Sequence, residues 1–352
     1  MDMVQVGWLS ILPPVIAIVL ALLTKEVISS LMLGILSGTL IYSCFTASGA
    51  GIAVKTVENT FNLMASKLAD NVSIILFLCL LGALVAVISR AGGSAAYGAW
   101  ASRKLKSKRS AQLATAALGV IIFIDDYFNC LTVGTVMKPV TDKHRISRAK
   151  LAYIIDATAA PVCMIAPVSS WAAAVAGFAE GGQGLNLFIK AIPFNFYALL
   201  TILMLVFISI LKLDYGPMAR HERNAMETGD LFSGKNPYGS MEEEESSPNG
   251  RVLYLVFPIL VLIVCCITGM IYSGGFFDGV GFVEAFSNSD ASVGLMLGSA
   301  VAFIITLVYF AIRRSMPFSA MMSSIPEGFK AMVPAILILT FAWSLKGMTD
   351  SL

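Results

Sequence analysis

Two adjacent carboxylates, Asp125 and Asp126, lie in the middle of an apolar stretch that covers residues 118–137. An aspartate placed in hydrocarbon costs about 2.5 to 3.5 kcal/mol on insertion scales, so such residues persist only where protein or water surrounds them. Carboxylate oxygens bind hard cations such as sodium, and they can hold a proton instead. The pair therefore predicts a site at which a cation and a proton compete. Asn129 and Thr132 follow at helical spacing, which would place their side chains beside the carboxylates.

Proton binding near neutral pH sets a requirement on these carboxyl groups. The pKa of an aspartate would have to rise from about 3.9 to near neutrality, which corresponds to about 4 to 5.5 kcal/mol. Burial and a like charge alongside can supply that rise, and the two neighbours should titrate as a coupled pair. The alternative for either residue alone is a structural role, since aspartate commonly caps a helix N-terminus or a turn. A structural role for both is disfavoured.

The next apolar segment, residues 149–177, offers further oxygen ligands. The candidates are Asp156, Thr158, Ser169 and Ser170. Asp156 could instead pair with Lys150 or Lys143, but it lies six residues past Lys150, about 9 Å along a helix, so we favour the ion site. The two serines could equally pack helices, because small hydroxyl residues are common at membrane helix interfaces.

Two prolines, Pro161 and Pro167, fall within this same segment. They remove backbone hydrogen bonds and should free carbonyl groups near Ala157 and Cys163, so a broken helix is predicted. Carboxylate, hydroxyl and carbonyl oxygens are ligands that suit sodium, which we expect at Asp125, Asp126 and Asp156. The sequence has no histidine or cysteine cluster of the kind that binds zinc or copper, so no cofactor is expected.

The composition is that of an integral membrane protein. Hydrophobic residues make up 57% of the 352 residues and charged residues only 13%, and the mean hydropathy is +0.81. Soluble domains carry about 25% charged residues. The net charge of +2 gives no reason to expect nucleic acid as a partner. The six cysteines show no paired spacing and are interpreted as packing residues.

Hydropathy predicts an all-α, polytopic fold. A spanning helix needs about 20 apolar residues. Spans are predicted near residues 7–23, 27–47, 71–89, 149–177, 187–211, 251–273, 292–312 and 331–346. Two stretches of mixed polarity, 51–70 and 315–330, are predicted as interfacial helices.

Lysine and arginine in the short loops predict the topology. The segments 90–109 and 138–150 are both strongly basic, so both should be cytoplasmic. The intervening stretch, 110–137, must then enter and leave on the same side, and we predict a re-entrant helical hairpin that turns near residues 125–129. Irregular backbone at that depth is tolerated only where it lines a cavity or is buried in protein, which again indicates a functional site.

The two ends of the chain show a weak internal repeat. The letters LMLG occur at residues 31–34 and again at 295–298, each time after a proline-containing span. Charge counting gives the copies opposite orientation, as in many secondary transporters. We therefore predict a first transporter repeat with the hairpin over 1–211, a solvated and poorly ordered cytoplasmic linker over 212–250, and an incomplete second inverted repeat over 251–352.

Residues 124–173, IDDYFNCLTVGTVMKPVTDKHRISRAKLAYIIDATAAPVCMIAPVSSWAA, resemble the signature region of the NhaC family of sodium/proton antiporters, in the ion transporter superfamily. The resemblance implies inverted repeats, a hairpin in each half and a site shared between the halves. It carries over onto Asp125, Asp126, Asn129, Asp156, Thr158, Ser169 and Ser170. Family members usually continue into a second hairpin, so a truncated chain is expected. They often have serine where this sequence has Ala157.

The leading hypothesis is a sodium/proton antiporter, a multi-pass protein of the bacterial plasma membrane and not an enzyme. Its partners would be the lipid bilayer, sodium ions and protons, with a homodimer left open and nucleic acid excluded. An organic-acid antiporter of the malate or lactate type is the alternative, although no basic residue lies near the hairpin tip. A non-transporting fragment or subunit is a further alternative. An intramembrane aspartyl protease, using Asp125 and Asp156, is disfavoured by the adjacent Asp126.

Overall fold

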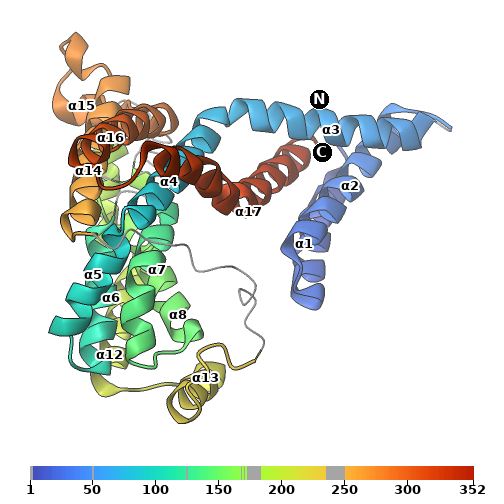
Figure 1. The fold of residues 1–352 in the computed structure, drawn as a ribbon. Coiled ribbons are helices and arrows are strands. Elements are labelled where there is room, and N and C mark those ends of the chain that lie inside the picture. Colours follow the sequence, from blue (N-terminus) through green and yellow to red (C-terminus); the bar gives the residue numbers. More distant parts are fainter. Residues whose placement is uncertain are drawn as a thin grey trace. The chain divides into compact units, whose positions relative to one another are not determined.

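The computed structural model describes residues 3–49, 51–123, 126–167, 169, 171–172, 184–234 and 250–352. Regular structure in these residues is entirely helical (Figure 1). Seven helical stretches among them are long and apolar enough to cross a membrane, which confirms the all-α, polytopic class. The chain divides into two compact units, residues 1–75 with 331–352 and residues 76–330. The helices α4 (Val72–Arg90) and α17 (Phe318–Ser351) run through the two boundaries.

In the first unit, glycines of the second long helix allow it to pack closely against the first. The helices of this unit are η1 (Gly7–Ile11), α1 (Leu12–Thr24), α2 (Val27–Thr46) and α3 (Gly51–Asp70). A Cβ atom added to Gly34 would lie 2.9 Å from the carbonyl oxygen of Pro13, and one added to Gly38 would lie 3.1 Å from the Pro13 ring. Residues 51–70, which were predicted to form an interfacial helix, form the helix α3, and Thr60 on it shares a 2.8 Å hydrogen bond with Thr39 on α2.

The second unit contains the predicted hairpin and the broken helix. Its helices, besides the parts of α4 and α17, are α5 (Gly93–Lys104), α6 (Lys108–Ile121), α7 (Asp126–Lys143), α8 (Arg148–Thr158), α9 (Ala160–Cys163), α11 (Gly184–Ala191), η3 (Ile192–Phe194), α12 (Phe196–Leu211), α13 (Gly216–Glu227), α14 (Leu253–Ser273), η4 (Phe276–Asp278), α15 (Phe282–Ser287) and α16 (Ala291–Arg313). The predicted span 187–211 is not one helix, because Pro193 interrupts it and Asn195 caps a new start.

The helices α14 and α16 pack almost backbone to backbone. A Cβ atom on Gly269 of α14 would lie 2.2 Å from the carbonyl oxygen of Gly294, and one on Gly298 would lie 2.6 Å from that of Cys265. Gly298 closes the LMLG of the second copy, as Gly34 closes that of the first. Both matched glycines therefore lie where the second helix of a pair meets the first.

The expectation of a separate interfacial helix at 315–330 is wrong, because α17 continues without a break from Phe318 to Ser351. Packing against a neighbouring helix explains why the polar first part of α17 is helical. A Cβ atom on Gly328 would lie 2.3 Å from the carbonyl oxygen of Gly82 on α4, so the two backbones are in direct contact. Small residues at such crossings stabilise membrane helix pairs.

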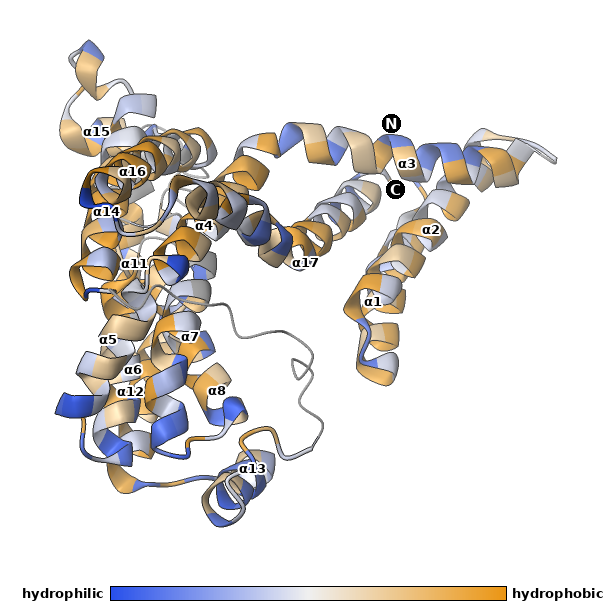
Figure 2. Ribbon diagram, in the orientation of Figure 1, coloured by the Kyte–Doolittle hydropathy of each residue, from blue (hydrophilic) through white to orange (hydrophobic). Residues whose placement is uncertain are grey.

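The linker predicted over 212–250 is not irregular throughout. Residues 216–227 form α13, which begins at a Gly-Pro pair, and residues 235–249 lie outside the described part of the chain. The buried residues of α13 are Glu222 and Ala225, so its inner face carries a charge. The basic end of the second unit comprises the end of α5, the start of α6, the end of α7 and the start of α8. Figure 2 shows hydrophilic residues gathered there and on α13.

Asp230 orders the turn that follows α13. Its carboxylate accepts backbone N–H bonds from Phe232 at 2.9 Å, Ser233 at 3.1 Å and Gly234 at 3.0 Å. These bonds, that of Phe232 foremost, favour the charged form and hold the pKa of Asp230 below its ordinary value.

The sign of this pKa shift predicts how the turn responds to acid. A carboxyl group with a lower pKa in the folded state stabilises the turn above its ordinary pKa, and that stabilisation is lost as the pH falls through the folded pKa. Protection of the amides of residues 231–234 against hydrogen exchange, corrected for intrinsic rates, should therefore fall below about pH 4. Asp230→Asn should remove this pH dependence. Protection that persists unchanged in acid would contradict the assignment.

Candidate ion-binding site at the hairpin break

The predicted hairpin is built from two short helices, neither of which is among the candidate membrane spans of the described residues. The 14 residues of α6 cover about 21 Å and the 18 residues of α7 about 27 Å, against roughly 30 Å of hydrocarbon. The backbone leaves the helix at Ile122, where φ is −92° and ψ is 67°, and α7 starts at Asp126. The turn thus begins slightly earlier than the expected residues 125–129.

Contacts at the basic end confirm that the chain returns to its starting point. Lys143, the last residue of α7, donates from Nζ to the carbonyl oxygen of Ser102 at 3.0 Å. Nε2 of His144 lies 3.1 Å from the carbonyl oxygen of Leu105. Because Ser102 and Leu105 precede α6, both ends of the hairpin lie together, and its tip is the break between the two helices.

The helix that follows the hairpin is also broken, as its prolines predicted. α8 ends at Thr158, Ala159 leaves the helical region with φ −82° and ψ −92°, and the short helix α9 starts directly after it with Pro161 in its first turn. Cys163 at the end of α9 donates from Sγ to the carbonyl oxygen of Phe123 at 3.2 Å. The two breaks are therefore joined.

Asn129, near the start of α7, joins this helix to the ends of α6 and α8. Its side-chain nitrogen lies within hydrogen-bond distance of the carbonyl oxygens of Gly119 at 2.6 Å, Ile122 at 2.8 Å and Thr158 at 3.2 Å. Asn129 is fully buried. Three carbonyl groups around one amide end fix its orientation, because only the nitrogen can donate to them. The oxygen of the same amide must therefore point elsewhere.

Two buried oxygen atoms on α7 have no hydrogen-bond partner among the described residues, Oδ1 of Asn129 and Oγ1 of Thr132. Thr132 is 2% exposed. Burying such an atom without a partner costs about 1 to 3 kcal/mol, so a bound ion or water is a natural partner for each of these two atoms. The two residues are three apart on one helix, a spacing that makes them neighbours on its surface. Both residues therefore lie on one side of α7, near the two breaks.

The sequence profile of the Na+/H+ antiporter family matches residues 162–352, more than half of the chain. The chain belongs to the Na+/H+ antiporter family. An uncharacterized protein of Haemophilus influenzae is 36% identical over 352 residues, an alignment that covers 96% of this chain. The chain spans 66% of the length of that relative. No solved structure matches this chain.

The structure brings some of the predicted site residues together. Asp126 opens α7 and is half-buried, and it shares one helical stripe with Asn129 and Thr132, as the spacing predicted. Thr158 contributes its carbonyl group to Asn129, while its hydroxyl donates within α8 to the carbonyl oxygen of Ile154 at 2.9 Å. Asp125 and Ser170 lie outside the described residues.

Two predicted residues have other surroundings in the structure. Asp156 is exposed, because it lies two residues before the buried Thr158 and so faces nearly the opposite side of α8. Neither lysine considered as its partner pairs with it in an ion bridge, and Lys150 binds Asp214 instead. Ser169 is buried and donates to the carbonyl oxygen of Cys163 at 2.6 Å, so its hydroxyl orders the turn after α9.

Sequence reasoning missed Gly119 and the role of Cys163. A Cβ atom on Gly119 would lie 2.1 Å from Oγ1 of Thr158, so only glycine lets α6 approach α8 closely enough for both to reach Asn129. An isolated glycine inside an apolar helical stretch is a signal for such a close approach. Cys163 was interpreted as a packing residue, and its link to the hairpin could not be read from spacing.

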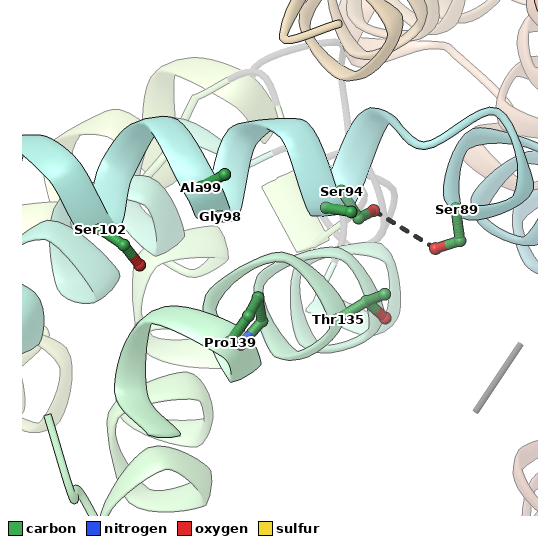
Figure 3. Close-up of a pocket in the computed structure, with 8 residues that line it drawn as sticks. Ser89, Ser94, Gly98, Ala99, Ser102, Thr135 and Pro139 are labelled. Atoms are coloured by element: carbon green, nitrogen blue, oxygen red, sulfur yellow. Dashed lines mark hydrogen bonds between the residues drawn. The ribbon is translucent and has the colours of Figure 1, made fainter. Parts of the chain in front are cut away.

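A cavity of about 430 Å³ lies beside the hairpin (Figure 3). Its lining is small or hydroxyl-bearing: Ser89, Ser94, Ala95, Gly98, Ala99, Ser102, Thr135 and Pro139. Ser94 shares a 3.3 Å hydrogen bond with Ser89, as Figure 3 shows. Thr135 is one helical turn from Thr132 on α7, so the cavity extends from the basic end to within a turn of the unpartnered hydroxyl.

Proposed function

We propose that this chain is an NhaC-type antiporter that exchanges sodium ions for protons across the plasma membrane. Sodium and proton compete at the hairpin tip, where Asp125 and Asp126 supply carboxylates and Asn129 and Thr132 supply neutral oxygens. The proton gradient drives the exchange, and each charge that crosses 100 mV gains about 2.3 kcal/mol. Asp156 enters the proposal as a further carboxylate on the broken helix.

The observation that carries the proposal is that Oδ1 of Asn129 and Oγ1 of Thr132 are buried without a hydrogen-bond partner among the residues that the structure describes. Their position adds to the argument, because α6 and α8 both end there and a helix C-terminus carries about half a negative charge. Broken helices in secondary transporters bind coupling ions at such ends. Oxygen atoms at the negative ends of two helices are the surroundings that a sodium ion requires.

The same residues favour a cation over an organic acid. A carboxylate substrate would need lysine, arginine or a helix N-terminus directed at it. Among the described residues 119–123, 126–132 and 158–163 there is no basic side chain. Of the two described helix N-termini at the joined breaks, that of α7 already carries Asp126, and that of α9 belongs to a helix of only four residues. The oxygen-rich tip is therefore better suited to a positive ion.

The placement of the matched glycines supports two related repeats. Gly34 brings α2 against α1, and Gly298 brings α16 against α14, in each case against a helix that contains proline. We propose that the two pairs descend from one repeated unit with opposite orientation in the membrane. The opposite orientation is supported by the lysines and arginines of residues 90–109 and 138–150, which predict that both segments are cytoplasmic.

Sodium-dependent proton release from everted membrane vesicles tests the function. The parent chain should release protons on addition of sodium, and Asp125→Asn with Asp126→Asn together should reduce release to the background of empty vesicles. Asp156→Asn measures the contribution of the exposed carboxylate. The matched control is Asp350→Asn, because Asp350 forms only an exposed ion pair with Lys346 and such pairs contribute little. Exchange at the parental rate in the double variant would remove the aspartate pair from the mechanism.

A further inference from the structure

We propose that Glu222, from the segment that joins α12 to α14, is a positioning residue for the ion site. The inference rests on the proposed function and adds a residue that acts on the ion site from the opposite end of α6 and α8. Glu222 is 2% exposed, which is rare for a glutamate unless it is paired. Its carboxylate forms an ion pair with Lys108 and accepts the backbone N–H of Ser147 at 2.7 Å.

The two partners of Glu222 are the starting points of two helices. Lys108 is the first residue of α6, and Ser147 is the N-cap of α8, where its hydroxyl accepts the N–H of Lys150 at 3.1 Å. A carboxylate near a helix N-terminus also interacts favourably with the helix dipole. One buried side chain thus joins the starts of α6 and α8.

Other contacts hold α13 and its flanks against the basic end. Lys150, 1% exposed, forms an ion pair with Asp214 just before α13. The backbone N–H of Arg148 donates to the carbonyl oxygen of Leu231 at 2.9 Å, and Arg145 donates to that of Met226 at 3.1 Å. These contacts lie before, within and after α13, so the helix is fixed along its length.

The far ends of the same two helices meet at Asn129. Gly119 lies eleven residues beyond Lys108, about 17 Å along α6, and Thr158 lies ten residues beyond Arg148, about 15 Å along α8. Both offer carbonyl groups to Asn129, and the two helices pack so closely there that a Cβ atom on Gly119 would lie 2.1 Å from Oγ1 of Thr158. The position of α6 relative to α8 is therefore fixed at two points, by Glu222 at one end and by Asn129 at the other.

Glu222→Ala tests the coupling, with Glu227→Ala as matched control because Glu227 lies on the same helix and is exposed. In the everted-vesicle assay we expect Glu222→Ala to raise the apparent KM for sodium about tenfold and to change the maximal rate much less. Amide hydrogen exchange in detergent should accelerate about tenfold at residues 119–122, and stay parental at 134–140. The control should leave both measurements unchanged.

A double substitution that removes both charges of the Lys108–Glu222 ion pair tests whether the parental behaviour can be restored. Lys108→Met strands the buried carboxylate, whereas Lys108→Met with Glu222→Gln removes both charges and should return exchange at 119–122 toward the parental rate. Acceleration confined to 145–150 and 216–227, with an unchanged KM, would overturn the inference. A parent chain without sodium-dependent proton release would refute the proposed function alone, since the amide measurements would still test Glu222.

Discussion

Asn129→Asp is expected to abolish sodium-dependent proton exchange and to lower the free energy of unfolding by about 2 to 4 kcal/mol. The substitution keeps Oδ1 but replaces the donating nitrogen with an oxygen. That oxygen would face the carbonyl groups of Gly119, Ile122 and Thr158, none of which could then receive its hydrogen bond. The measurements are proton release from everted vesicles and denaturation in detergent.

Asn195→Asp is the matched control for this substitution. The side chain of Asn195 caps α12 by accepting the N–H of Ala198 at 3.2 Å, and aspartate is an equally good N-cap. Its stability and exchange should therefore equal those of the parent. Parental stability in Asn129→Asp would show that the amide does not join the three helix ends.

Gly119→Ala is expected to destabilise the chain by about 1 to 3 kcal/mol, the usual cost of overpacking a core. The new Cβ atom would lie 2.1 Å from Oγ1 of Thr158 and 2.7 Å from its Cβ, so α6 must move away from α8. That movement separates the two carbonyl groups that share Asn129, and the affinity for sodium should fall with it. Denaturation and the sodium dependence of proton release measure the two effects.

Gly134→Ala is the control on the neighbouring helix. There the nearest atom to an added Cβ is Cδ1 of Ile155 at 3.5 Å, an ordinary contact, and alanine favours a helix over glycine by about 1 kcal/mol. The control should be neutral or slightly stabilising. Thr158→Ala in the Gly119→Ala background removes the nearest clashing atom and should recover part of the loss. Equal stability of Gly119→Ala and the parent would refute the close approach.

The hairpin and the broken helix could be predicted because their causes are local. Basic loops on both sides of 110–137 require a return to the same side, and Pro161 prevents the helix from continuing normally. The stripe of Asp126, Asn129 and Thr132 follows from spacing alone once α7 is a helix. Which carbonyl groups meet Asn129 is set by packing between α6 and α8, and no pattern in the chain encodes it.

The helix α13 was missed for a related reason. Its inner face contains Glu222, so a search for apolar periodicity finds little there. The helix is stabilised by partners far along the chain, among them Lys108 and Ser147, and only the folded structure brings these together. The exposure of Asp156 also depends on helix phase, because a shift of two residues moves a side chain to the opposite face.

The shortness of α6 and α7 has a consequence for biogenesis. The two helices have 14 and 18 residues, and α6 carries charges at its start and α7 at both ends, so neither is a good substrate for stepwise insertion by a translocon. The carbonyl group of Phe123 at the tip also takes its donor from outside the hairpin, from Cys163 of α9. We therefore expect α6 and α7 to enter the bilayer late and together, after the long helices that surround them have been inserted. Reporter enzymes fused at residues 106 and 144 should then reside in the same compartment.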